Sequence, residues 1–276
     1  MVGRVSRSIL VILSERGYWA EELVGPMTAF DTQGYDVTFA TPTGKRPHAL
    51  PASLNTSYVD PPLGRSVTTP EVAALGRAVD GSELLDSPRN LEEWLPVRPY
   101  TSDRDYLRKL EDYHTKLAEV DIQGYDALLI VGGSGPIVDL ANNARVHDLI
   151  LLFKQAGKLV AAECYGVACL AFARDWNDRR SIIWGKHVTG HCKEYDYTDG
   201  TGFLGTDFVM GPPPYPLEYI LRDATGPDGA YHGNFGKPLS VIVDYPFVTG
   251  RSTPDSFLTG EKIVEVLERG LTRYGW

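Results

Sequence analysis

A cysteine at the end of a short apolar run is the residue of this chain best suited to chemistry. Cys164 stands in the sequence Glu-Cys-Tyr-Gly, between the apolar run 159–162 and a stretch of small residues that suits a helix. This pattern predicts a buried strand, a sharp turn and then a helix, the arrangement of a nucleophile elbow. Because the N–H groups and the dipole of the helix start favour negative charge, we expect a lowered pKa and a reactive thiolate at Cys164.

The alternative is that Cys164 only fills space in the core, as buried cysteines often do. Cys169, which falls inside the helix expected after the turn, fits that interpretation well. Cys192 could share a metal with Cys164, but the spacing does not match a zinc motif, so we predict no metal. Three cysteines without regular spacing also do not make a disulfide framework.

The elements that must position this cysteine follow an α/β pattern. A continuous apolar run at 8–14, a helix from about 20 to 33 and a strand at 35–40 open the chain as a β-α-β unit, which indicates a parallel sheet. The other elements that we expect are strands at 125–131, 239–243 and 247–250, strand or edge segments at 182–184 and 187–191, helices at 103–117, 143–156 and 256–274, and a loop rich in glycine, proline and aromatic residues at 196–216.

A segment rich in proline interrupts this pattern. Residues of about 45–120 show weak periodicity until the helix near 103–117, and they carry several aromatic side chains that need packing partners. We predict one domain over 1–276, with this segment inserted as a cap over the carboxyl edge of the sheet. A flexible surface excursion is the alternative.

A second turn rich in glycine follows the strand at 125–131. The sequence Gly-Gly-Ser-Gly-Pro at 132–136 is not a phosphate loop, because no Gly-Lys-Ser/Thr follows. Its free N–H groups, at Gly133 and Ser134, are suited to binding an oxyanion, although a simple tight turn is equally consistent with the pattern.

The composition excludes several classes of partner. The chain has 276 residues, a net charge of −9 and no basic run, so nucleic acid is not expected as a partner. No apolar run reaches the length of a membrane span, and the run at 9–13 is too short for a secretory signal. Together with the cysteine usage, this predicts a cytoplasmic protein.

Four stretches, at 18–26, 34–45, 126–140 and 248–256, together with the Cys164 turn, resemble the DJ/PfpI superfamily of class I glutamine amidotransferase-like proteins. Within it the chain is most similar to the heat-shock chaperone and glyoxalase III group. The resemblance implies a three-layer α/β sandwich of the flavodoxin-like kind, with a mostly parallel central sheet and the inserted cap. It also implies a homodimer, a role in the stress response and no cofactor.

The resemblance further implies a set of site residues. The family has an essential glutamate four residues before a proline, and Glu22 occupies that position before Pro26, whereas its neighbour Glu21 is expected to be a solvated helix residue. The glyoxalase III group carries histidine directly after the cysteine, where this chain has Tyr165. Another branch places histidine in a Val-Thr-Thr-His stretch, and the similar Val-Thr-Gly-His makes His191 the third candidate, with His232 as the alternative. A lone histidine is also often structural.

These residues lead to a first functional hypothesis with two alternatives. Cys164 would attack a small electrophilic carbonyl, Glu22 would shuttle protons, and the N–H groups of Gly133, Ser134 and Tyr165 would hold the oxyanion, with Trp19 and His232 as further substrate-binding candidates. The resemblance implies a glyoxalase III or deglycase reaction, hence a lyase or hydrolase. The alternatives are a specialised hydratase or hydrolase for a larger nitrile, isocyanide or aldehyde, and a stress chaperone or redox sensor.

Overall fold

The computed structural model describes residues 6–60, 63–195 and 216–276. In this part of the chain, an eight-stranded sheet has the order β12-β10-β11-β7-β6-β1-β2-β5. The strands from β11 to β5 run parallel to one another, and β10 pairs antiparallel with both β11 and β12. The mostly parallel α/β sheet predicted from the sequence is therefore confirmed.

The central strands are mostly apolar because helices cover both faces of the sheet. In β6, for example, all four residues are buried. The strands of the sheet are β1 (Ser8–Ile12), β2 (Asp36–Thr41), β5 (Arg89–Asn90), β6 (Ala127–Ile130), β7 (Leu159–Glu163), β10 (Val241–Asp244), β11 (Phe247–Gly250) and β12 (Arg273–Tyr274).

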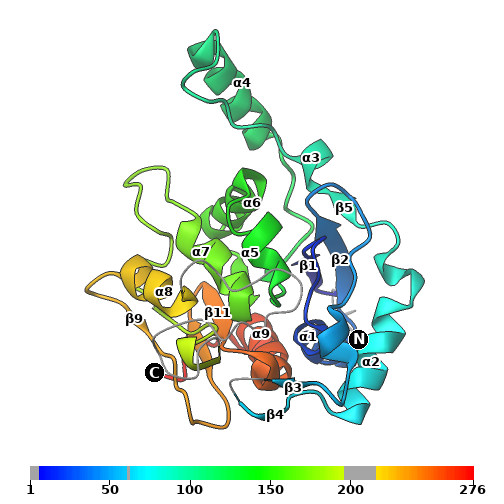
Figure 1. The fold of residues 1–276 in the computed structure, drawn as a ribbon. Coiled ribbons are helices and arrows are strands. Elements are labelled where there is room, and N and C mark those ends of the chain that lie inside the picture. The colour runs from blue at the N-terminus through cyan, green and yellow to red at the C-terminus, as the bar shows by residue number, and fades with distance from the viewer. Residues whose placement is uncertain (1–5, 61–62, 196–215) are drawn as a thin grey trace, which may run out of the picture.

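Helices lie on both sides of the sheet, as Figure 1 shows, and a hydrophobic cluster fills the space between each helical layer and the sheet. One face of the sheet packs against α1 (Ala20–Gln33) and α9 (Ser256–Arg269). The other face packs against helices that follow the glycine turn and the Cys164 turn. These helices are α5 (Gly135–Asp139), α6 (Ala144–Gln155), α7 (Ala168–Phe172) and α8 (Leu217–Thr225).

The last helix is shorter than the sequence predicted. We expected it to continue to residue 274, but α9 ends at Arg269 because Gly270 adopts a left-handed conformation with φ of 66°. A glycine in this conformation is a common helix terminator. The chain then reverses, and β12 joins the edge of the sheet beside β10.

The inserted segment contains several short elements. They are η1 (Pro51–Leu54), β3 (Val59–Asp60), β4 (Arg65–Ser66), α2 (Pro70–Asp80), η2 (Glu83–Leu85), α3 (Leu91–Trp94) and α4 (Tyr106–Ala118). Helix α2 packs against α1, whereas the first turns of α4 project away from the body of the protein (Figure 1). At the base of α4, Tyr113 and Leu117 join the core. A cap function for the segment stays a prediction.

The region after α7 differs most from expectation. Residues 182–184 form a turn and not a strand. The segment β8 (His187–Val188) pairs with β9 (Ala230–Tyr231) in a separate two-stranded sheet, and η4 (Lys193–Tyr195) follows it. Most of the loop predicted at 196–216 lies outside the described residues. Within the described ranges, no helix is long and apolar enough to cross a bilayer.

Candidate active site

Cys164 lies at the turn that the sequence predicted, directly after β7. It begins the short helix η3 (Cys164–Val167) and has a φ of 53°, in the left-handed region that residues other than glycine rarely adopt. Such backbone strain is found mostly at functional sites. The side chain is 4% exposed, so the sulfur lies in an environment that excludes most water.

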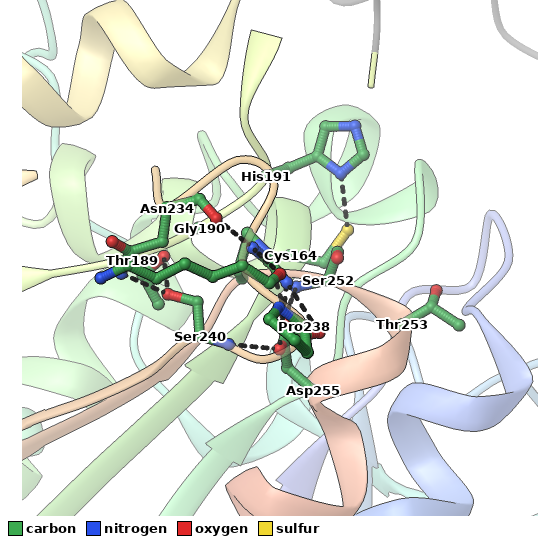
Figure 2. Close-up of polar contacts among 12 residues, drawn as sticks. Cys164, Thr189, Gly190, His191, Asn234, Pro238, Ser240, Ser252, Thr253 and Asp255 are labelled. Carbon is green, nitrogen blue, oxygen red and sulfur yellow. Dashed lines mark hydrogen bonds and ion pairs between the residues drawn. The ribbon is translucent and has the colours of Figure 1, made fainter. Parts of the chain in front are cut away.

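His191 provides a basic group for this sulfur. Its Nδ1 lies 3.3 Å from Cys164 Sγ, and Figure 2 shows the imidazole directed at the sulfur. The ring of Tyr165 stacks on the same imidazole, with 4.2 Å between the ring centroids. The structure thus places the imidazole of His191 in hydrogen-bonding distance of the sulfur.

The backbone that leads to His191 is held by a buried hydrogen-bond network around Thr189 (Figure 2). The N–H of Thr189 donates to Thr249 Oγ1 at 2.9 Å, and its hydroxyl donates to the carbonyl of His232 at 2.6 Å. The hydroxyl of Ser240 also donates to Thr189 Oγ1 at 3.3 Å. This network links His191 to β11 and thereby to the central sheet.

Glu22 lies on the other side of the site, in the first turns of α1. It is 1% exposed, and Thr253 donates a hydrogen bond of 3.3 Å to its Oε1. Burial raises the pKa of Glu22 to about 7, while hydrogen bonds from Cys164, Thr253 and the N–H of Gly133, and the charge of His191, act in the opposite direction. Near neutral pH, therefore, both protonation states of this carboxyl are populated.

The pKa of Cys164 contradicts the expectation from the sequence. Burial raises the pKa of its thiol well above the ordinary range, and the negative charge of Glu22 raises it further. The N–H groups of Gly133 and Tyr165 act in the opposite direction but do not outweigh these causes. Desolvation raises the pKa of the thiol more than the N–H groups at the helix start lower it. Cys164 can therefore form a thiolate only if another group in the site takes its proton and carries positive charge beside it.

More carboxyl groups are buried near Glu22 than the sequence predicted. Glu21 was expected to be a solvated helix residue, but it is 9% exposed and burial raises its pKa to about 8. Burial also raises the pKa of Glu163 well above its usual range, and that of Asp255 to about 6. Ser256 donates a 2.8 Å hydrogen bond to Glu163 Oε1.

The remaining predicted residues are distributed over three places. The N–H of Gly133 interacts with both Cys164 and Glu22. Ser134 is instead the N-cap residue that precedes α5, and the structure gives it no contact with the sulfur among the described residues. The backbone N–H of Trp19 donates to the carbonyl of Gly132 at 3.2 Å, which places this residue beside the glycine turn.

His232 does not join this site. Its Nε2 lies 2.8 Å from Nδ1 of His187, whose ring stacks on Trp276. The hydrogen bond between the imidazoles occupies one nitrogen of each. Of the two histidine candidates, only His191 contacts Cys164.

Two residues of the site were missed by the sequence analysis. Thr253, which donates to Glu22, belongs to a Ser-Thr-Pro-Asp turn with a capping box, and that pattern could have located it at the start of α9. Tyr195, whose ring centroid lies 5.3 Å from that of His191, has no such signal, because only the tertiary structure brings η4 to the imidazole.

Nothing in the described residues marks a metal centre. In those ranges, no three His, Cys, Asp or Glu side chains gather in a group that could hold an ion. Cys192 is fully buried, and burial raises the pKa of its thiol, as it does for Cys169. Both have the properties of packing residues.

Comparison with known proteins agrees with this architecture. Residues 13–204 match the model of the family described as ThiJ/PfpI family-like. This match covers more than half of the chain, and the chain therefore belongs to this family. The resemblance to the DJ/PfpI superfamily predicted from the sequence is confirmed.

Two curated relatives match the chain at similar identity. It is 28% identical over 149 residues to the glutamine amidotransferase-like class 1 domain-containing protein 1 of Bos taurus, and this match covers 54% of this chain and 62% of the relative. It is 27% identical over 158 residues to the glutathione-independent glyoxalase HSP31 of Saccharomyces cerevisiae, and this match covers 54% of this chain and 61% of the relative. The chain thus spans less than two thirds of the length of either relative.

Solved structures support the same fold over nearly the whole chain. Glyoxalase III of Candida albicans superposes with a TM-score of 0.58 at 17% identity, covering 94% of this chain and 96% of that one. DJ-1beta of Drosophila melanogaster has a TM-score of 0.53 at 17% identity, with coverage of 95% and 91%. At this identity the likeness establishes the flavodoxin-like three-layer fold.

Proposed function

We propose that this protein is a cofactor-independent enzyme that uses Cys164 as a nucleophile on a small carbonyl or related electrophile, with hydratase or lyase chemistry of the glyoxalase III or deglycase kind. The observation that carries the proposal is the arrangement around the sulfur. Cys164 at a strained turn has the imidazole of His191 at 3.3 Å and interacts with the buried carboxyl of Glu22. A nucleophile, a base and an acid are thus present together.

The first step is the addition of sulfur to a dicarbonyl compound. The proton of the Cys164 thiol passes to His191, and the resulting thiolate bonds to the aldehyde carbon, whose π electrons move to oxygen. The imidazolium of His191 then gives its proton to this oxyanion. The N–H groups of Gly133 and Tyr165 lie beside the sulfur and stabilise negative charge there.

The second step moves one proton between neighbouring carbons and one proton between their oxygens. The carboxylate form of Glu22 takes the proton from the carbon bonded to sulfur and returns it to the adjacent carbonyl carbon. The hydroxyl proton passes from the oxygen of the first carbon to the oxygen of the second, which becomes the hydroxyl group of the product. One carbon is oxidised and its neighbour is reduced, so a thioester forms without an external oxidant. A pKa of about 7 suits Glu22 to this role, because both of its protonation states are available at neutral pH.

The third step releases the product. Neutral His191 takes a proton from water, whose oxygen bonds to the thioester carbon, and the carbon–sulfur bond then breaks. A 2-hydroxy acid leaves, and the thiolate of Cys164 regains its proton from His191. The net reaction is the addition of one water molecule to the dicarbonyl. A relative described as a glutathione-independent glyoxalase supports this choice of substrate class.

The experiment that tests this proposal compares the purified protein with three single variants. Loss of methylglyoxal and glyoxal, and formation of the hydroxy acid, would be followed in the presence of a metal chelator. We expect Cys164→Ala to abolish turnover, and Glu22→Gln and His191→Gln to lower it by about 10²–10⁴-fold, the usual range for a lost acid or base. Exposed Glu71→Gln serves as the control.

A substrate larger than methylglyoxal is the second candidate, and the aromatic side chains near the site favour it. The ring of Trp19 meets Tyr58 edge to face at 6.4 Å, and Tyr195 contacts Phe235 at 5.6 Å. The same assay with larger aldehydes, nitriles and isocyanides distinguishes the two candidates. Turnover of a larger compound alone would support a specialised hydratase or hydrolase and a recognition role for the inserted segment.

Two results would overturn the enzymatic proposal. Activity that survives Cys164→Ala would exclude Cys164 as the nucleophile. No turnover of any compound, with ready oxidation of Cys164 by dilute peroxide, would support a redox sensor or stress chaperone instead. The homodimer and the cytoplasmic location stay predictions, and the mass of the protein in solution tests the first.

A further inference from the structure

We propose that Tyr195 is a positioning residue, which holds the imidazole of His191 against Cys164 and favours its imidazolium form, so that the sulfur reacts as a thiolate. The inference rests on the proposed role of Cys164 as the nucleophile and assigns a new residue to it. It concerns an aromatic cluster formed by Tyr165, His191, Tyr195 and Phe235.

The cluster fixes the imidazole by direct ring contacts. Tyr165 stacks on His191 with 4.2 Å between centroids and 28° between ring planes, and Tyr195 contacts it at 5.3 Å and 47°. Phe235 in turn meets Tyr195 edge to face at 5.6 Å. Since the ring of His191 has neighbours in two tyrosines, its rotation away from the sulfur would break these contacts.

The cluster also stabilises the cation that forms when Cys164 gives its proton to His191. Burial raises the pKa of the thiol, so a thiolate forms only if a cation is stabilised next to it. The electron-rich faces of tyrosine rings attract cations within about 6 Å, and this attraction is greater where water is excluded. Both tyrosine centroids lie within that distance of the imidazole ring.

The charged groups around His191 and Tyr195 act in both directions. Glu22 interacts electrostatically with His191, and its carboxylate favours the imidazolium. Lys193 and Glu194 directly precede Tyr195 in η4, and their opposite charges act in opposite directions. The guanidinium of Arg251 lies 5.9 Å from the Tyr195 ring and disfavours a second cation nearby, but it forms a buried ion pair with Asp255.

The test measures the reactivity of the sulfur without any substrate. Iodoacetamide alkylates thiolates, and mass spectrometry of peptides would follow the alkylation of Cys164 as a function of pH in the full chain. We expect Tyr195→Leu to slow alkylation at neutral pH about tenfold and to move the profile to higher pH. Tyr195→Phe keeps the ring and should restore the wild-type profile, and Tyr100→Leu at an exposed site is the matched control.

A double-variant cycle separates positioning from a general structural role. If Tyr195 acts through the imidazole, Tyr195→Leu should have no further effect on the profile in a His191→Gln background. An equal slowing in both backgrounds, or an unchanged profile in Tyr195→Leu, would overturn the proposal. Because alkylation needs no carbonyl substrate, this outcome is independent of whether the glyoxalase-type reaction is found.

If Tyr195→Leu does not fold, as judged by circular dichroism, an NMR titration of the wild-type and Tyr195→Phe proteins tests the proposal instead. The imidazole resonances of His191, assigned by comparison with His191→Gln, would be followed during a pH titration. We expect the imidazolium to persist to higher pH in the reduced wild-type and Tyr195→Phe proteins than in protein alkylated at Cys164. Equal titration in all three would refute an imidazolium–thiolate pair and the role of Tyr195 with it.

Discussion

At the scale of single residues, Gly132 decides whether the side chains of Glu22 and Cys164 can lie close together. A Cβ atom placed on Gly132 would lie 2.3 Å from Glu22 Oε2, 2.4 Å from the Glu163 carbonyl oxygen and 2.7 Å from Cys164 Cβ. Only a residue without a side chain fits between the end of β7 and α1. The close approach of acid and sulfur therefore depends on a position that has no functional group of its own.

We expect Gly132→Ala to lower activity about 100-fold and stability by about 1–3 kcal/mol, because the added methyl group must push Glu22 or Cys164 aside. Steady-state kinetics and urea unfolding measure the two effects. Gly124→Ala is the matched control, since no atom lies within 4 Å of the Cβ built there. Wild-type activity in Gly132→Ala would contradict the close contact.

At the scale of elements, the packing of α1 against α9 places the acid of the site. A Cβ atom on Gly260 of α9 would lie 2.6 Å from the Cα of Pro26, and one on Gly25 of α1 would lie 2.6 Å from the backbone of Ser256. The two helices therefore approach each other through glycines. Since α1 carries Glu22 and the start of α9 follows Thr253, this contact sets the geometry of the acid.

Substitution at this crossing should move the helices apart. We expect Gly260→Ala to destabilise the protein by about 1–3 kcal/mol and to lower kcat, because Glu22 would shift away from Thr253. The adjacent exposed position provides the control, Glu261→Ala, which should change stability by less than about 0.5 kcal/mol. Unchanged thermal unfolding in Gly260→Ala would show that the helices can separate without cost.

At the scale of the whole molecule, buried carboxyls link the stability of the fold to pH. Burial raises the pKa of Glu21 to about 8, of Glu22 to about 7 and of Asp255 to about 6. Carboxyls have ordinary pKa values near 4, so the folded state binds these protons more tightly than the unfolded state. Their contribution to stability is full below about pH 4 and is lost as the pH rises through the folded values.

Glu21 offers the clearest test of this linkage, since no catalytic role is proposed for it. We expect Glu21→Gln to raise the free energy of unfolding by about 1–3 kcal/mol at about pH 9 and to change it little at about pH 5. Denaturant unfolding at several pH values measures the difference. Exposed Glu71→Gln is the control, and an unchanged pH dependence in Glu21→Gln would mean that the carboxyl is not desolvated.

The sequence alone determined the architecture and the position of Cys164 at a turn directly after a buried strand. Strand periodicity, the glycine turn and the Cys-Tyr-Gly turn are local patterns, and the elements that they predicted are present in the structure, among them α1 with the predicted bounds Ala20–Gln33. Local patterns failed where long-range packing decides. At 182–184 the apolar residues are buried in a turn, and Gly270 ends the last helix early.

Only the tertiary structure decided how the site is completed. The choice of His191 over His232 depended on β8 pairing with β9, and the contact of Tyr195 with the imidazole depended on η4. The protonation of the site could not be read from the chain either, because desolvation depends on what covers a group. Desolvation reversed the expected direction of the pKa shift of Cys164 and raised the pKa of Glu21. Both effects arise from elements that are distant in sequence.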